Sequence, residues 1–231
     1  MRALLFLILG ATSVLAQADG REVFLRLLTI SPGSLPAESF LVDPSGGEAG
    51  KAAVIKSYLN HEGLTVKLAG NEVLFSKSAK KEDAADAANE IAKATLPKEG
   101  GRFIILFVPA ENEKFSAVVV PDSLKDFPPG AFHVANTSKF PLKLTLEDKA
   151  YPFEPGEQKV IADPPMQDNQ HCAMRAYTID KGKENQIGSG LLPHPGTKRS
   201  IQVVFDNPAT KKTELKGFKD ISPPSAEGAP K

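Results

Sequence analysis

The sequence is poor in residues that stabilise or equip many small proteins: it has one cysteine, no tryptophan and three tyrosines. A single cysteine excludes an intramolecular disulfide, so the fold must depend on a packed core, which a chain of 231 residues can form. We expect Cys172 to be buried as a small hydrophobe. The scarcity of tryptophan and tyrosine gives no support for a site that stacks sugars on aromatic rings.

Neither sign of charge is in excess, because 28 basic residues balance 28 acidic ones. Nucleic-acid binding depends on clustered lysine and arginine side chains, and no such block occurs in the sequence. We therefore expect no nucleic-acid partner. The chain also lacks the H-E-x-x-H, G-x-S-x-G and C-x-x-C motifs. Nothing in the sequence requires a cofactor, and we predict none.

Residues 1–18 have the pattern of a cleavable signal peptide. Arg2 supplies the positive start, residues 3–9 are apolar, and Ala16 and Ala18 are the small residues before a cleavage site. The apolar run is much shorter than the about 20 residues of a transmembrane helix. We predict export to the periplasm or the cell exterior, with no membrane insertion after cleavage. At the other end, residues 222–231 are rich in proline, alanine and glycine and are predicted to be a disordered tail.

Short apolar or alternating stretches between 19 prolines and 18 glycines predict an all-β fold, mostly β with one short helix. We expect one or two β-sandwich (immunoglobulin-like) domains. The predicted halves are residues 19–125 and residues 131–221, joined by an exposed, proline-rich segment at residues 122–130. Residues 64–75 and 142–153 align without gaps, as two related halves would, and as unrelated alternating strands also would by chance.

The one helix is expected at residues 80–95, as a connector within the first half. Ala84, Ala87, Ala88 and Ile91 have the i, i+3, i+4, i+7 spacing of a helix face. Acidic residues gather at its start, where they favour the helix dipole.

The densest group of chemically useful residues lies in residues 163–172. Asp168, Asn169, Gln170 and His171 precede a predicted strand, and His194 lies in a later loop of the same half. If the two loops meet, Asp168, His171 and His194 are the candidates for a metal site or an acid–base pair. The alternative, which we favour, is that these side chains bind the backbone of their own turn and that no metal is present.

The segments DNQH (residues 168–171) and PHPG (residues 193–196) carry a resemblance over roughly residues 100–221. This part resembles a family of uncharacterised exported bacterial proteins. The resemblance implies a bacterial host and export, and it implies no activity.

Three functions are compatible with these features. We favour a non-enzymatic binding or scaffolding protein whose partner is another protein or a component of the cell envelope. The first alternative is a hydrolase or metalloprotein that uses Asp168, His171 and His194. The second is a structural subunit that pairs through exposed edge strands.

The signal peptide leads to a direct prediction. Mass spectrometry of the native protein is expected to find an amino terminus at Asp19, or at Gln17 if cleavage occurs two residues earlier, because export signals are removed from the mature chain. A mature protein that retains Met1 contradicts export by this route.

Overall fold

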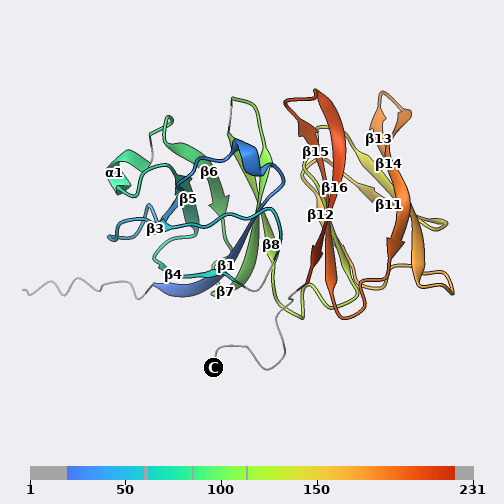
Figure 1. Cartoon of the computed structure of the whole chain (residues 1–231), viewed down its shortest axis with the longest axis horizontal. Helices are drawn as coiled ribbons and strands as arrows, with labels where there is room; N and C mark the ends of the chain where they lie inside the picture. The colour runs from blue at the N-terminus through green and yellow to red at the C-terminus, as the bar shows by residue number, and fades with distance from the viewer. Residues whose placement is uncertain (1–19, 60–61, 85, 113, 222–231) are drawn as a thin grey trace, which may run out of the picture.

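The computed structural model describes residues 20–59, 62–84, 86–112 and 114–221. The predicted signal peptide and the predicted tail lie outside the described residues. The described chain is mostly β with one short α-helix, as predicted (Figure 1). No helix in these ranges is both long enough and apolar enough to span a bilayer.

The strands form four sheets of four strands each, which we number I to IV. In spatial order, sheet I contains β4 (Leu64–Leu68), β1 (Arg21–Thr29), β7 (Gly101–Pro109) and β8 (Phe115–Pro121). Sheet II contains, also in spatial order, β3 (Lys51–Ala52), β2 (Phe40–Val42), β5 (Glu72–Ser76) and β6 (Glu90–Thr95). Sheet III contains β12 (Gln158–Ile161), β9 (Phe132–Asn136), β15 (Arg199–Asn207) and β16 (Lys212–Asp220). Sheet IV contains β11 (Lys149–Phe153), β10 (Leu142–Leu146), β13 (His171–Asp180) and β14 (Lys183–Pro193). A 3-10 turn (Pro32–Ser34) and α1 (Lys81–Ala84) complete the elements.

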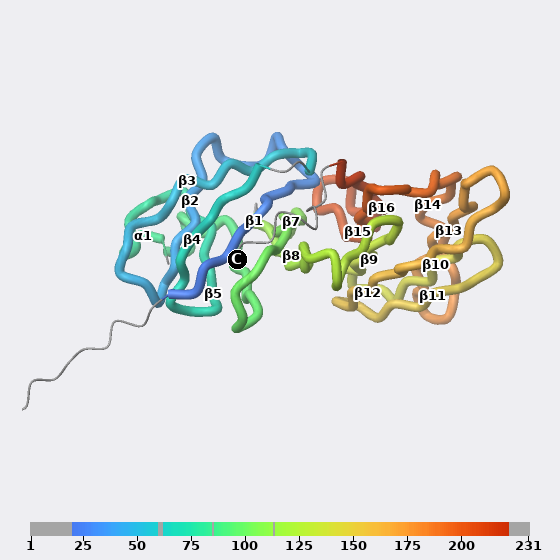
Figure 2. The backbone as a smooth tube through the Cα atoms, turned by 90° about the horizontal axis from the view of Figure 1, so that it is seen from below, coloured from blue at the N-terminus to red at the C-terminus, as the bar shows by residue number. Residues whose placement is uncertain are grey.

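The first and last eight strands repeat one topology and form two lobes (Figures 1 and 2). Adding eight to each strand number converts sheet I into sheet III and sheet II into sheet IV. Even the parallel pairs correspond, β1 with β7 and β9 with β15. The predicted alignment of residues 64–75 with 142–153 is nevertheless wrong, because it matches β4–β5 with β10–β11 rather than with β12–β13. Alternating strands resemble one another at any position, so a gapless match does not identify equivalent hairpins.

The prediction of a helix at residues 80–95 is wrong for most of that range. Of the described residues in that range, Lys81–Ala84 alone are α-helical, and Glu90–Thr95 form β6. β6 pairs with β5, and it buries Ala92 and Ala94 while Lys93 and Thr95 face solvent. The alanines fit a strand as well as a helix, and pairing with β5 satisfies the backbone while the alanines fit against the core.

The sheets stack face to face in the order II, I, III, IV. One core lies between sheets I and II, and another lies between sheets III and IV. A third core joins the two sandwiches: Ile104 and Leu106 of sheet I pack with Ile201 and Val203 of sheet III. Sheets I and III are therefore buried on both faces, which explains why residues 103–108 of β7 are all apolar and all buried.

The segment that joins the sandwiches is anchored in this third core, contrary to the expectation of an exposed linker. Phe127 is fully buried in it. Asp122 is also fully buried, although Lys125 and Asp126 between them are exposed. Residues 122–130 therefore cross between the sandwiches as part of the packed interface.

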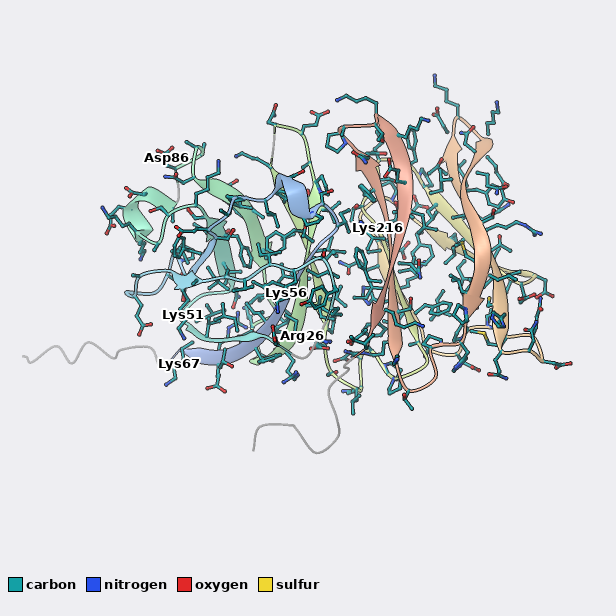
Figure 3. All side chains as sticks on the ribbon, viewed as in Figure 1. Arg26, Lys51, Lys56, Lys67, Asp86 and Lys216 are labelled. Atoms are coloured by element: carbon teal, nitrogen blue, oxygen red, sulfur yellow. The ribbon has the colours of Figure 1, made fainter. Side chains whose placement is uncertain are left out.

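Four buried charges lie where the sandwiches meet: Arg26 on β1, Asp122, Arg199 on β15 and Asp220 on β16 (Figure 3 labels Arg26). Each is at most 1% exposed. Arg26 Nε donates to Asp122 at 2.9 Å, and Arg26 Nη1 donates to Asp220 at 2.8 Å. Arg199 Nε donates to Asp220 at 3.0 Å, and Arg199 Nη1 donates to the Phe127 carbonyl at 2.8 Å. We call these four charged residues the interface quartet.

The two charge signs in the quartet balance. Burial alone raises the pKa of Asp220, but the hydrogen bonds and positive charges of Arg26 and Arg199 outweigh it and hold the pKa of Asp220 below its ordinary value. The carboxylate is therefore kept ionised between the two guanidinium groups.

Removing one member of the quartet is expected to be costly, because it leaves the other buried charges uncompensated. We expect Arg199→Met to lower the free energy of unfolding by about 3–5 kcal/mol, measured by urea denaturation. The control is Lys143→Met, which breaks a partly exposed pair with Glu184 and is expected to cost about 0–1 kcal/mol. An equally small effect of Arg199→Met contradicts a stabilising role for the quartet.

Candidate functional site

The structure brings the two predicted loops together at one end of sheet IV. β13 and β14 are antiparallel, and His171 lies opposite Pro193. Immediately beyond this pair, the His194 N–H donates to the Gln170 carbonyl at 2.9 Å. The loops border an open depression of about 480 Å³ that Lys149 and Asp163 also line.

The side chains of Asn169, His171 and His194 hydrogen-bond to the backbone of their own loops. His171 Nδ1 lies 2.8 Å from the Asn169 carbonyl, and the His171 N–H donates to Asn169 Oδ1 at 3.0 Å. His194 Nδ1 accepts a hydrogen bond from the Gly196 N–H at 2.9 Å. Gln170 has a left-handed backbone, with φ of 60°, and completes the tight turn. These contacts are the ones expected of a hydrogen-bonded turn.

The contacts do not assemble a metal centre. Across the described ranges, no group of three or more histidine, cysteine, aspartate or glutamate side chains is arranged to hold a metal ion. Asp168, His171 and His194 therefore do not form a three-ligand set. Cys172 is fully buried, and burial raises the pKa of its thiol, so it is a core residue as expected.

The more unusual feature of sheet IV is β14, its edge strand (Figure 1). With 11 residues it is the longest strand among those described, and most of it is exposed. Its partner strand β13 covers only one of its two edges. Within the described part of the chain, no strand pairs with the other edge.

Hydrogen bonds of β13 show which residues of β14 direct their backbone N–H and C=O groups away from β13. We call these residues outward-facing. The Ala173 N–H donates to the Glu147 carboxylate, and the Glu147 N–H donates to the Ala173 carbonyl, on the β10 side of β13. Because the backbone groups of Ala173 face away from β14, those of its cross-strand partner Leu191 face away from β13. The Ile179 N–H likewise donates to Pro141, so its partner Glu184 also faces outward.

A β-bulge changes this alternation in the middle of the strand. Tyr177 pairs with Gln186 and Ala176 pairs with Gly188, so Ile187 is an extra residue. Counting by alternate residues from each end, Glu184 and Gln186 face outward before the bulge. Leu191 and Ser189 face outward after it.

Other sheet edges are closed by side chains. On β4, Lys51 Nζ (labelled in Figure 3) donates to the Thr65 carbonyl at 3.1 Å, and Asp43 accepts the Ala69 N–H at 2.6 Å. On β11, Pro152 has no N–H, and its carbonyl accepts from Lys159 at 2.7 Å. These are devices that prevent strand addition.

The remaining edges are short, charged or covered. β3 and β12 have only two and four residues. β16 carries exposed Lys212, Lys216 and Lys219 along its length. β6 and β8 lie against each other at the side of the first sandwich, and β14 and β16 do so less extensively at the side of the second. β14 differs because residues 185–193 carry no charge and Leu191 is 63% exposed.

The sequence analysis did not identify β14 as an edge strand. The available signal was the uncharged run from Asn185 to Pro193, which is unusual for an exposed strand. No protein-family model matches this chain, and neither does any curated protein with which it was compared. The function must therefore be inferred from the geometry of this end of sheet IV.

The histidines provide a test of the loops. Equilibrium dialysis with zinc is expected to give the same low binding for wild type and for His171→Ala/His194→Ala, because the described residues provide no set of three ligands around these rings. Tighter zinc binding by the wild type contradicts this result and revives the metal alternative.

Proposed function

We propose that this chain is an exported, non-enzymatic binding or scaffolding protein whose binding surface is the outward edge of β14. The observation that carries the proposal is the row of outward backbone groups at Glu184, Gln186, Ser189 and Leu191. Export is supported by the signal pattern of residues 1–18.

Such an edge binds an extended segment by strand addition. Backbone hydrogen bonds supply most of the affinity, and alternate side chains supply specificity. An incoming strand satisfies N–H and C=O groups of β14 and shields Leu191 from water. It therefore gains both hydrogen bonds and apolar burial.

The predicted site residues take a secondary place in this proposal. Asp168, Asn169, Gln170, His171 and His194 lie at the end of β14, where an added strand would reach the two loops. Their exposed polar atoms are suited to hydrogen bonds with the end of such a strand. No observation among the described residues favours the hydrolase alternative.

The rest of the molecule suits a scaffold. Sheet IV is an outermost layer, and sheets III, I and II lie behind it in one stack. The edge of β14 is therefore held at a fixed position relative to the first sandwich. A segment bound to this edge would therefore also have a fixed position relative to the first sandwich.

Peptide binding tests the proposal. The probe is an alternating threonine–valine peptide with lysine ends, labelled for fluorescence anisotropy, because these residues favour an extended strand. We expect wild type and Ser189→Ala to bind it. Ser189→Pro is expected to lose binding, because proline removes an outward N–H while leaving the hydrogen bonds to β13.

An N-methylated version of the same peptide separates backbone pairing from simple hydrophobic adsorption. Methylation of alternate amides removes the donors that strand addition requires. Equal binding of both peptides, or no binding of either by the wild type, overturns the proposal. Unfolding curves of the Ser189 variants establish that both are folded.

A further inference from the structure

We infer that the seam between the two sandwiches, formed by the third core and the interface quartet, is an acid-sensitive joint that protonation of His133 loosens. Three features carry this inference independently of strand addition at β14. They are the place of the His133 ring, the nitrogen atom of that ring that has no partner, and the charge that lies close to it.

His133 lies in the seam. It belongs to β9, which pairs with β12 on one side and with β15 on the other. Its neighbours Phe132 and Val134 pack between sheets III and IV, so the side chain of His133 lies on the opposite face of sheet III, toward sheet I. The side chain is 3% exposed, and the centroids of its ring and the Phe127 ring are 5.5 Å apart.

The ring has a hydrogen-bond partner at one of its two nitrogen atoms. Nε2 lies 3.0 Å from Gln158 Oε1 on β12, so the neutral ring carries its proton on Nε2 and donates it to this amide oxygen. Nδ1 is buried and has no hydrogen-bond partner among the residues that the structure describes. Protonation of the ring creates an N–H at Nδ1, and a buried N–H without an acceptor is costly.

The groups around the ring also oppose a positive charge. Gln158 from β12 and Phe127 from the joining segment (residues 122–130) are uncharged, and the charge that acts on the ring is that of Arg199 on β15. The guanidinium carbon of Arg199 lies 4.4 Å from the centroid of the Phe127 ring, so the arginine and the histidine contact the same ring. No carboxylate in the described part of the chain hydrogen-bonds to His133, and those of the quartet already bind its two arginines.

These surroundings make the stability of the seam depend on pH. Burial is the main cause that lowers the pKa of His133 below its ordinary value. The charge of Arg199 lowers this pKa further, whereas the hydrogen bond to Gln158 acts in the opposite direction. When the seam opens, water reaches the ring and its pKa returns toward the ordinary value of about 6.5. The open form therefore binds the proton more readily, so the seam is stable above this pH and loosens as the pH falls below it.

The joining segment reports on the seam because Phe127 anchors it in the third core. The Phe127 N–H donates to the Ser123 carbonyl at 3.0 Å, and the Gly130 N–H donates to the Lys198 carbonyl at 2.8 Å. Loosening of the seam is expected to expose both amides to exchange with solvent. Because sheet IV is held in place through this seam, acid is also expected to release the fixed position of β14 relative to the first sandwich.

Hydrogen–deuterium exchange of the purified protein at about pH 7.5 and about pH 5.5 tests the inference, with each rate corrected for the intrinsic exchange rate at that pH. Carboxylates with ordinary pKa values of about 4 stay ionised over this range. In the wild type, protection of the Phe127 and Gly130 amides is expected to fall by up to about tenfold at the lower pH, because opening takes up one proton. Protection in β5 and β10, which belong to the outer cores, is expected to change less.

Three substitutions separate His133 from other titrating groups. His133→Gln is neutral at every pH, and its protection is expected to be the same at both pH values, whatever its overall stability. Gln158→Glu puts a carboxylate beside Nε2, which favours the protonated ring, and is expected to reduce or remove the fall in protection. The matched control is His171→Gln, in the loop at the end of sheet IV, which is expected to show the wild-type fall.

Each outcome decides the inference. A fall confined to the joining segment, present in the wild type and in His171→Gln but absent from His133→Gln, supports it. Unchanged protection in the wild type overturns it, and so does a fall that persists in His133→Gln. An equal fall in β5 and β10 also overturns it, because acid then destabilises the whole fold. If His133→Gln does not fold, Gln158→Glu decides: a reduced fall supports the inference and an undiminished one overturns it.

Discussion

The buried pairing of two arginines with two aspartates at the seam between the sandwiches is the interaction on which the rest of the structure depends. Arg26 and Arg199 come from different sandwiches, and both bind Asp122 and Asp220. Buried charges are tolerated only when they are paired and hydrogen-bonded. Because each partner comes from a different part of the chain, the quartet forms only when the two sandwiches are docked. We regard it as a device that specifies one docking arrangement of an otherwise apolar interface.

The packing between the two sandwiches limits the surfaces on which a partner can bind. Sheets I and III use both faces in packing, so neither has a free face. Sheets II and IV each have an outer face and free edges, and most of the edges are closed by lysines, proline or short length. The edge of β14 is left as the place where a long backbone segment can still form hydrogen bonds. The proposed function follows from this distribution.

The repeat of one eight-strand topology separates what is common to the two halves from what is particular to each. β6 is the counterpart of β14, since it occupies the same position in sheet II that β14 occupies in sheet IV. β6 has six residues and lies against β8, whereas β14 has 11 and extends from its turn at Lys181 to the loop at His194. In both halves this edge strand lies against the last strand of the facing sheet, β6 against β8 and, less extensively, β14 against β16, and β14 is the longer of the two.

From the sequence alone it was possible to identify the mostly β fold, the loops at residues 163–171 and 193–199 and the burial of Cys172. These features follow from local alternation, turn residues and hydrophobicity, which neighbouring residues decide. The helix prediction at residues 80–95 was wrong because the alanine spacing there fits both a helix and a strand. Pairing with β5 selects the strand. The sequence also could not show that Arg26 meets Asp220, or that β14 lies at an edge. Both depend on which distant strands become neighbours, and that is decided by packing of whole sheets rather than by the residues on either side.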